Sequence, residues 1–330
     1  MSIIYFNVPG SPGGGGPSVF VYKTAQALNK HGHQVIYDKP NRADVALCII
    51  ETGKTLRKID RQKTRTLLRI DGIYCKEYWH GGPGRAWRGD MTALHTKLQT
   101  DIPSVDHMVY QSQWSKDRID SEIVKRDQNF SIIRNGVDVK LFRPTPRTPD
   151  GFLNLFHIGK MRNGYIMESL IGVYHNLRGR NHKVKLILAG NMDAECSKVY
   201  AQHKGDPNIV HLGAFPNTGA TKAFGMGDIY LGPRMGSSCD NVIVEALACG
   251  LPVVIPSWGG NNELITDEKE GIIVSSGHWD YGPDYIQKLA DGVEKIIPDL
   301  NGFKLRARKH AVRELTIDKM VEKYLKAMGI

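Results

Sequence analysis

Short apolar runs alternate with amphipathic stretches along the chain, and this alternation limits the fold more than any other feature. A helix predicted at residues 18–30 places Val21, Ala25 and Leu28 on one face. Continuous apolar runs that alternate with helices are typical of parallel sheets covered on both faces. The sequence therefore predicts an α/β protein with doubly wound parallel sheets. The expected strands are SIIYFNV, HQVIYD, DVALCII, TRTLLRID and HMVYQS, then FLNLFHIG, VKLILAG, NIVHLG, DIYLGP and LPVVIP.

A proline-rich segment separates these strands into two series. RPTPRTPDG, residues 143–151, contains three prolines in nine residues and is typical of a linker. We therefore predict one domain at residues 1–145 and a second at 146–315. A chain of 330 residues has room for two domains of ordinary size. Residues 316–328 form a last predicted helix, whose apolar positions 317, 320, 321, 324 and 325 share one face.

Composition excludes several classes of protein. The sequence has no run of eighteen apolar residues, and its first residues, MSIIYFNVPG, are typical of a strand rather than a signal peptide. Its five cysteines are scattered without a Cys-x-x-Cys pair, so neither a zinc site nor a disulfide framework is expected. We therefore expect a cytoplasmic protein. The net charge of +10 favours nucleotide phosphates, an anionic membrane surface with peripheral attachment, or nucleic acid as partners.

The segment SSCDNVIVEALACGLPVV, residues 237–254, carries the most specific chemical pattern. It predicts a polar loop, a short helix and a turn into a buried strand. A helix N-terminus has unpaired N–H groups and a partial positive charge, which suit an anion. Glu245 adds a carboxylate that can accept hydrogen bonds from vicinal hydroxyls. A phosphate site beside a hydroxyl site fits a sugar nucleotide, although acids near helix N-termini also have a purely structural use.

This segment resembles the donor-site signature of the retaining glycosyltransferases of family 4, the glycosyl transferases group 1, which have the GT-B fold. Three more segments are similar to that family in the same order: GGPSVFVYKTAQALNKHGHQV, SIIRNGVDVKLFRP and FHIGKMRNGYIMESLIGVYHNL. The resemblance implies two Rossmann-like domains facing a central cleft. The N-terminal domain would bind the acceptor and the C-terminal domain the nucleotide sugar. It also implies that helix 316–328 packs back on the N-terminal domain.

The resemblance implies phosphate-binding residues in both domains. The glycine loop PGSPGGGGPS aligns the family's glycine pair with Gly15 and Gly16, where positive φ and close ligand approach are expected. Lys160 stands where the family has an arginine, and Tyr165 stands where it has a lysine. Arg162 offers a guanidinium two residues after Lys160. Since Arg binds phosphate in bidentate fashion and Lys as a point charge, the phosphate geometry is expected to differ.

The family's acidic pair has the spacing Glu-x7-Glu. Glu245 matches the second acid, which holds the ribose, whereas Ser237 replaces the first, which lies by the transferred sugar. Asp240 is expected to cap the helix, with a donor contact as the alternative. The implied donor-binding residues of this segment are Ser237, Ser238, Asp240, Asn241, Val242 and Glu245.

The acceptor side is less specific. Many relatives carry a histidine where DVALCIIETG instead ends in Glu51 and Thr52. Asp71, at the end of the next predicted strand, is the first catalytic candidate, followed by His80 in a Gly-Pro-rich loop. Lys160 is the third, since it would stabilise the departing phosphate.

These features predict transfer of a sugar, with retention of configuration, from a nucleoside-diphosphate sugar to an acceptor hydroxyl. No Asp-x-Asp cluster is present, so neither a metal nor a cofactor is expected. The expected acceptors are glycans and lipid-linked or protein-linked sugars. Two alternatives remain: an enzyme of the same fold that acts on nucleic acid, suggested by the charge, and a non-catalytic sugar-nucleotide binder, suggested by Ser237 and Tyr165.

Overall fold

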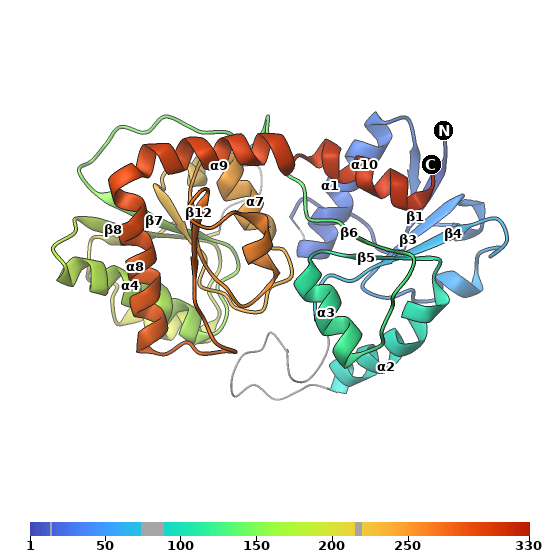
Figure 1. The fold of residues 1–330 in the computed structure, drawn as a ribbon, viewed down its shortest axis with the longest axis horizontal. Helices are drawn as coiled ribbons and strands as arrows, with labels where there is room; N and C mark the ends of the chain where they lie inside the picture. Colours follow the sequence, from blue (N-terminus) through green and yellow to red (C-terminus); the bar gives the residue numbers. More distant parts are fainter. Residues whose placement is uncertain (14, 74–88, 215–219) are drawn as a thin grey trace. The chain divides into compact units, whose positions relative to one another are not determined.

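A computed structural model describes residues 1–13, 15–73, 89–214 and 220–330. These residues form two compact units (Figure 1). Unit 1 contains the described residues up to Gly136 together with Leu315–Ile330. Unit 2 contains Val137–Glu314. The chain therefore leaves unit 1 after Gly136 and returns to it for its last helix.

Unit 1 is built on a six-stranded sheet in the order β2-β1-β3-β4-β5-β6, in which every neighbouring pair is parallel. Such a sheet needs helical crossovers between its strands, which supply cover for its faces. The strands are β1 (Ile3–Phe6), β2 (Gln34–Ile36), β3 (Val45–Ile49), β4 (Arg65–Arg69), β5 (His107–Tyr110) and β6 (Phe130–Ile132), and the helices are α1 (Gly16–Lys30), α2 (Gly89–Ser104), α3 (Gln113–Glu122) and α10 (Ile317–Met328).

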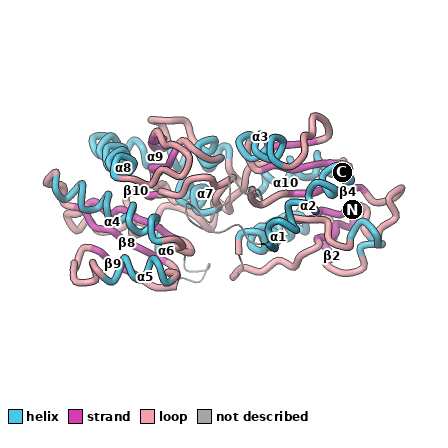
Figure 2. Tube along the Cα trace, turned by 90° about the horizontal axis from the view of Figure 1, so that it is seen from below, coloured by secondary structure: helices cyan, strands magenta, loops and turns pink. Residues whose placement is uncertain are grey.

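Alternate residues of these strands supply two separate cores. Leu67 and Val109 belong to a core with residues of α1 and α10, whereas Leu68 and Met108 belong to a core with residues of α2 and α3. Successive side chains of a strand point to opposite faces, so the two cores lie on the two faces of the sheet. Figure 2 shows helices on both sides of the strands in unit 1. Burial on both faces explains why the sequences of these strands are continuous apolar runs.

Unit 2 has a second parallel sheet of six strands, in the order β12-β11-β10-β7-β8-β9. The prediction of doubly wound parallel sheets is thus confirmed for both halves of the chain. The strands are β7 (Leu153–Ile158), β8 (Val184–Ala189), β9 (Ile209–His211), β10 (Ile229–Leu231), β11 (Val253–Pro256) and β12 (Gly271–Val274), and the helices are α4 (Gly164–Gly179), α5 (Ala194–Ala201), α6 (Ala220–Phe224), α7 (Asn241–Ala248), α8 (Pro283–Ile296) and α9 (Leu300–Glu314).

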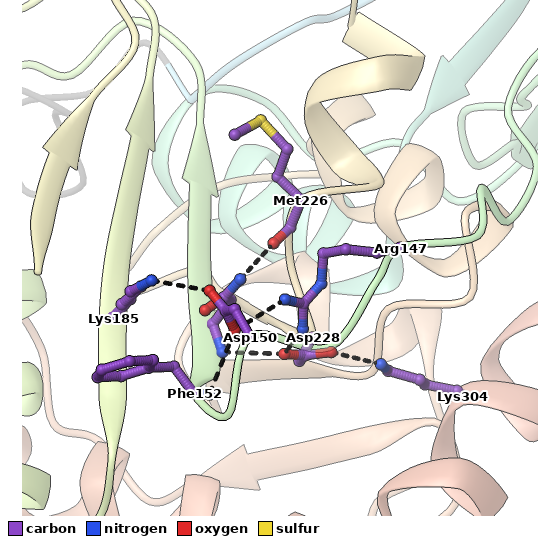
Figure 3. A network of polar contacts seen from close by, with 8 residues as sticks. Arg147, Asp150, Phe152, Lys185, Met226, Asp228 and Lys304 are labelled. Carbon is purple, nitrogen blue, oxygen red and sulfur yellow. Dashed lines mark hydrogen bonds and ion pairs between the residues drawn. The ribbon is translucent and has the colours of Figure 1, made fainter.

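The proline-rich segment at residues 143–151 is tied to unit 2 by a buried aspartate (Figure 3). Asp228 precedes β10, and its Oδ2 accepts hydrogen bonds from Arg147 at 2.6 Å and from the backbone N–H of Asn154 at 2.9 Å. Its Oδ1 accepts a hydrogen bond from Lys304 of α9 at 2.6 Å. Asp150 adds an ion pair with Lys185 at 2.8 Å. One buried carboxylate with two charged partners therefore fixes both this segment and α9 to the sheet.

The last helix, α10, completes the core of unit 1. Met320, Val321 and Tyr324 are buried, and the Tyr324 ring lies 5.5 Å from the ring of Phe20 on α1. The helix approaches the backbone at Gly136 so closely that a Cβ there would lie 2.8 Å from the Ile317 Cα. A glycine is therefore required at Gly136. Of the helices in the described ranges, none is both long and apolar enough to cross a bilayer.

Candidate functional site

The candidate site of unit 2 lies where its strand order reverses. β7 is the first strand of this sheet; the chain goes on to β8 on one side of it and later returns to β10 on the other. In open parallel sheets, ligands bind beyond the carboxyl ends of the strands at such a point. The loop after β7 carries Lys160 and Arg162, and the loop after β10 leads through Ser237 and Ser238 into α7. The topology thus brings the two predicted donor-binding segments to one edge of the sheet.

The loop after β10 is held by close backbone contacts with the turn that follows β11. The Gly236 N–H donates to the Trp258 carbonyl at 3.0 Å, and the Gly260 N–H donates to the Ser237 carbonyl at 2.7 Å. Gly259 has a φ of +137°, and a Cβ on it would lie 3.1 Å from the Ser237 oxygen. Backbone can approach backbone this closely only where a side chain is missing. The Gly-Gly turn therefore positions the serine loop.

The N-terminus of α7 has no side-chain cap. Asp240 is the N-cap residue, but its side chain accepts no hydrogen bond from the helix. It pairs with Asn261 instead: Asn261 Nδ2 donates to Asp240 Oδ2 at 2.9 Å, and the Asp240 N–H donates to Asn261 Oδ1 at 2.8 Å. The expected capping role of Asp240 is therefore wrong, because Asn261 takes up the carboxylate. Apart from the Ile243 N–H, which donates to the Asp240 carbonyl at 3.2 Å, the helix N-terminus keeps N–H groups for another acceptor.

A buried serine hydroxyl lies directly before this helix. Ser237 and Ser238 are each 5% exposed, and the Ser238 Oγ has no hydrogen-bond partner in the described part of the chain. A buried hydroxyl without a partner is costly, so its presence points to a ligand. Asn241, Val242 and Glu245 are half-buried on the first turns of α7. The site thus combines N–H donors, a hydroxyl and a carboxylate.

The two basic candidates after β7 are on a firmly held loop. Asp193 accepts a hydrogen bond from the Asn163 N–H at 2.9 Å, and its own N–H donates to the Met161 carbonyl at 3.0 Å. Lys160 and Arg162 themselves are exposed, and neither forms an ion pair within the described residues. Fixed backbone with unengaged cationic side chains is suited to binding an anion such as a diphosphate.

Tyr165 shows what replaces the lysine expected from the family. Its ring stacks on that of Tyr281 with the centroids 4.2 Å apart, and its hydroxyl accepts a hydrogen bond from Asn163 at 2.8 Å. Tyr281 in turn accepts a hydrogen bond from the Met235 N–H at 2.9 Å, and burial raises the pKa of the Tyr281 hydroxyl. The aromatic pair therefore supports the loop before Ser237. It supplies no charge to a phosphate.

The N-terminus of α4 differs from that of α7. The N–H of Gly164, the first residue of α4, donates to the Glu195 carboxylate at 3.1 Å. A negative charge from the protein therefore already lies at this helix end, where it is favourable. Of these two helix N-termini beyond the sheet, the one at α7 is better suited to a ligand phosphate.

His157 lies beneath the site and was not predicted from the sequence. Its Nδ1 lies 2.8 Å from the Leu231 carbonyl, and its ring stacks on Tyr230 at 5.7 Å. Burial, together with a smaller effect of the nearby Arg234 charge, lowers the pKa of His157 to about 4. The ring is therefore neutral at pH 7. Arg234, exposed on the loop after β10, is a further basic residue that the motif comparison missed.

The glycine loop of unit 1 differs from the expectation in its backbone. Gly15 is the N-cap residue of α1 with a φ of −72°, and Gly16 is the first residue of the helix. Neither residue has the positive φ that we expected, because the helix begins here. A Cβ on either glycine would meet no protein atom within 4 Å. The protein itself therefore does not require glycine at these positions, and α1 also lacks a side-chain cap.

One of the predicted catalytic residues, Asp71, is among the described residues of unit 1. The Asp71 carboxylate is paired with the buried Arg69 guanidinium and accepts a hydrogen bond from Gln111 at 3.1 Å. Arg69 also donates to Asn135 at 2.9 Å, so Asp71 belongs to a buried polar network that joins three segments. His80 lies outside the described residues. Among those described, no group of three or more His, Cys, Asp or Glu side chains could hold a metal ion.

Some residues that shape the site could not have been found from motifs. Asn261 lies in the segment SWGGNNELI, which the sequence linked to the donor only through its glycines. Tyr281 belongs to a loop without any recognisable pattern. Of the three residues Asn261, Tyr281 and Tyr165, only Tyr165 was marked by the sequence, because it replaces a lysine of the family.

Comparison with known proteins gives one family for unit 2. Residues 153–299 match the family model "Glycosyl transferases group 1". The chain is 25% identical to a GDP-mannose-dependent alpha-mannosyltransferase of Mycobacterium tuberculosis over 53% of its own length and 44% of that protein. It is 28% identical to a D-inositol 3-phosphate glycosyltransferase of Paenarthrobacter aurescens over 69% of its length and 58% of that protein. It is 23% identical to the gpi3 component of the Schizosaccharomyces pombe phosphatidylinositol N-acetylglucosaminyltransferase over 51% and 38%. The chain spans about half the length of these curated relatives.

Solved structures give the same fold. Anabaena HepE in complex with UDP and glucose has a TM-score of 0.72 and 16% identity, and it is matched over 100% of this chain and 99% of its own. Sucrose-phosphate synthase of Thermosynechococcus elongatus has a TM-score of 0.79 and 14% identity over 98% and 97%. At these identities the likeness concerns the fold alone.

Proposed function

Because this chain carries a glycosyl transferases group 1 domain at residues 153–299, we propose that it transfers a sugar from a nucleoside-diphosphate sugar to an acceptor hydroxyl. The observation that best supports this proposal is the buried, unpartnered Ser238 hydroxyl before the uncapped N-terminus of α7. Glu245, one helical turn further, adds a carboxylate for the ribose hydroxyls. This combination fits a phosphate joined to a sugar.

Lys160 and Arg162 complete the proposed diphosphate site from the loop after β7. Their cationic side chains would stabilise the negative charge that develops on the departing diphosphate. Lys160 is therefore the catalytic candidate on the donor side. Gly15 and Gly16, at the uncapped N-terminus of α1, are proposed to leave space for a phosphate. Electrostatic stabilisation of this kind requires no metal or cofactor, and retention of configuration follows from the family resemblance.

The acceptor is proposed to be a polyol or sugar, free or linked to a lipid or protein. Two of the relatives are named for inositol-containing molecules, D-inositol 3-phosphate and phosphatidylinositol. The net charge of +10 is compatible with such anionic acceptors and with peripheral binding to an anionic membrane in the cytoplasm. Asp71 and His80 remain candidates on this side. Nucleic acid is the second choice of acceptor, and it rests on the charge alone.

A thermal-shift screen of sugar nucleotides tests the donor proposal. UDP-glucose, UDP-N-acetylglucosamine and GDP-mannose are compared with the free nucleoside diphosphates. At 100 times its Kd, the correct ligand should stabilise the chain by about 2.7 kcal/mol. If no nucleotide in this panel raised the melting temperature, the proposal would be overturned.

The Ser238→Ala variant sharpens this screen. The hydroxyl has no protein partner among the described residues, so its removal should leave the melting temperature of the free chain unchanged or higher. Donor affinity should fall by about 5-fold, which corresponds to roughly 1 kcal/mol for one lost hydrogen bond. Ser197→Ala, at an exposed position of α5, is the matched control and should change neither.

A second candidate function is binding of a sugar nucleotide without transfer. It is favoured by Tyr165, which stacks on Tyr281 and supplies no charge where the family has a lysine. Hydrolysis of the bound donor in the absence of acceptor separates the two functions. An enzyme releases the sugar slowly into water, whereas a binder leaves the sugar nucleotide intact. The variant Tyr165→Lys tests whether the missing charge limits the rate.

A further inference from the structure

Unit 1 contains a pocket at the point where its own strand order reverses. β1 is the first strand of this sheet and has β2 on one side and β3 on the other. A pocket of about 540 Å³ lies beyond the carboxyl ends of β1 and β3, where open α/β sheets bind ligands. No residue of the donor site contributes to it. Its polar lining includes Asn7, Glu51, Thr52, Lys54, Lys58 and Lys97.

The wall of this pocket contains a strained turn directly after β3. Ile50 has a φ of +70°, and the Glu51 N–H donates to the Ile49 carbonyl at 2.9 Å. These two features define a γ-turn of the rare, positive-φ type. For a β-branched residue such a φ is unfavourable. Strained backbone of this kind persists only where surrounding contacts enforce it, and it is concentrated at functional sites.

Asn7, which directly follows the neighbouring strand β1, holds the turn with its side chain. Its Oδ1 accepts a hydrogen bond from the Ile49 N–H at 2.7 Å, and its Nδ2 donates to the Glu51 carbonyl at 2.7 Å. The Ile50 N–H donates to the Arg69 carbonyl of β4 at 2.8 Å. The turn is therefore fixed from both adjacent strands, β1 and β4.

Helix α2 fixes the residue that follows. Asp101 is 6% exposed and accepts hydrogen bonds from the Thr52 N–H at 2.8 Å and from the Thr52 hydroxyl at 2.9 Å. Lys97 pairs with Asp101 at 2.6 Å and lies 3.6 Å from the Glu51 carboxylate. The backbone on both sides of Glu51 is therefore held, at Ile50 by the turn and at Thr52 by Asp101. Its side chain, 41% exposed, lines the pocket.

The charges around the pocket differ from those of the donor site. Lys97 lies closer to Asp101, at 2.6 Å, than to the Glu51 carboxylate, at 3.6 Å, so Glu51 keeps acceptor capacity for hydroxyl donors of a ligand. Lys54 and Lys58 are exposed on the pocket lining, and neither has an ion-pair partner among the described residues. The pocket therefore offers one carboxylate on a fixed backbone and two unneutralised ammonium groups.

We propose that this pocket binds the acceptor, a polyhydroxylated molecule that carries an anionic group such as a phosphate. Glu51 accepts hydrogen bonds from the acceptor hydroxyls, and Lys54 and Lys58 attract its anionic group. Asn7 is a positioning residue, since it acts through the turn. The assignment of the ligand as an acceptor rests on the proposed function above. The same chemistry occurs in a free polyol phosphate and in the headgroup of an inositol phospholipid.

Calorimetric titration of the full chain tests this proposal without a donor. The soluble probes are myo-inositol 1-phosphate and glucose 6-phosphate, each compared with its unphosphorylated parent. We expect at least one phosphate to bind 10-fold or more tightly than its parent. Sedimentation with vesicles containing 20 mol% phosphatidylinositol distinguishes the lipid source from the soluble one. The pocket assignment is overturned if neither phosphate nor the vesicles bind.

Two variants locate the binding on the pocket. Glu51→Gln removes the charge with little change in volume. It should lower the affinity for the probe by about 10- to 100-fold, as expected for a lost charged hydrogen bond. The control Asp127→Asn lies in an exposed pair with Lys125 and should have no effect. The double variant Lys54→Ala/Lys58→Ala should abolish the preference for the phosphate, whereas Lys63→Ala, at an exposed site, should retain it. Equal affinity in Glu51→Gln and the wild type would contradict the role of Glu51.

A nucleotide titration on the same variants separates the two proposals. All four variants should bind the donor as the wild type does, because their changes are confined to unit 1. Loss of nucleotide binding in every protein, wild type included, would be a failure of the proposed function. Normal nucleotide binding with no effect of Glu51→Gln on the probes would be a failure of the pocket assignment alone.

Discussion

Both units are built on six-stranded parallel sheets, but with different strand orders, and we propose that they bind their ligands in different ways. In unit 2 the strand order reverses between β7 and β10. The segments beyond these strands present mainly backbone groups, namely the N-terminus of α7 and a serine loop held by glycines. In unit 1 the strand order reverses at β1, between β2 and β3. The pocket beyond β1 and β3 is lined by side chains, namely Glu51 and lysines around a strained turn. The fold fixes where a ligand binds, and the local chemistry fixes which ligand it is.

This contrast has a physical basis. A diphosphate is the same in every nucleoside-diphosphate sugar, so N–H groups at a helix end, assisted by Lys160 and Arg162, can bind it whatever the sugar. Acceptors differ in the arrangement of their hydroxyls and charges, so they need side chains that can be exchanged. The predictions below test this division between backbone recognition in unit 2 and side-chain recognition in unit 1.

Gly259→Val should have the largest effect. The residue has a φ of +137°, and its Cβ would lie 3.1 Å from the Ser237 oxygen, so the serine loop must move. The strain should cost about 1–3 kcal/mol of folding free energy. Donor affinity should fall by about 100-fold or more, because several contacts are lost together. Calorimetry with the nucleoside diphosphate measures this, and Gly205→Val, an exposed site with nothing within 4 Å, is the control. Wild-type affinity in Gly259→Val would show that the loop does not bind the donor.

Glu245→Ala should weaken the donor by about 10- to 100-fold, since a charged hydrogen bond contributes roughly 1.5–3 kcal/mol. Binding of the acceptor probes should stay unchanged. Glu51→Ala should give the reverse pattern, with weaker acceptor and unchanged donor. The affinity of each variant is measured for both ligands. If either substitution weakened both ligands equally, the assignment of donor and acceptor to separate units would be contradicted.

Lys160→Ala should raise the donor KM and lower the rate by about 3- to 10-fold, because an exposed charge is screened by solvent. Arg162→Ala should have the same direction of effect if both side chains reach the diphosphate. Lys198→Ala on α5 is an exposed control in the same unit. Steady-state kinetics at two ionic strengths provide the measurement. If neither Lys160→Ala nor Arg162→Ala changed KM or the rate, the phosphate site would lie elsewhere.

The smallest effect concerns acid stability, since each unit has one buried histidine among its described residues. Burial lowers the pKa of His107 and of His157 to about 4, so protonation favours the unfolded chain. Their contribution to stability is complete above pH 6.5 and is lost as the pH falls from 6.5 towards 4. His107→Phe and His157→Phe should each flatten the pH dependence of the free energy of unfolding in this range. Chemical denaturation at pH 7 and pH 5 would show this, and an unchanged slope in both variants would contradict it.

The same contrast explains what could be predicted from the sequence. The parallel sheets were predictable because strands buried on both faces, such as DVALCII and VKLILAG, are continuous apolar runs. The loop, helix and strand of residues 237–254 were predictable because glycines and a helix start at fixed spacing leave a motif, whereas the donor role of this segment stays a prediction. The short strand β12 left no such signal.

The remaining features depend on contacts between distant segments. The Asp240–Asn261 pair overturned the expected cap, and nothing local distinguishes a capping aspartate from a paired one. The turn at Ile50 depends on Asn7, more than forty residues earlier in the chain. A strained isoleucine cannot be recognised from its neighbours, so the sequence placed Glu51 on the acceptor side but did not show the turn that holds it.

The position of α10 has a consequence for biosynthesis. Unit 1 begins to leave the ribosome first, but Met320, Val321 and Tyr324 reach its core only after all of unit 2 has been made. Until then, Phe20 and Val21 lack their partners on α10, whereas unit 2 can fold as an uninterrupted segment. The nascent chain therefore completes its units in the reverse of their order of synthesis. A stalled chain that ends before residue 315 would expose apolar surface of unit 1 and become a target for chaperones and proteases.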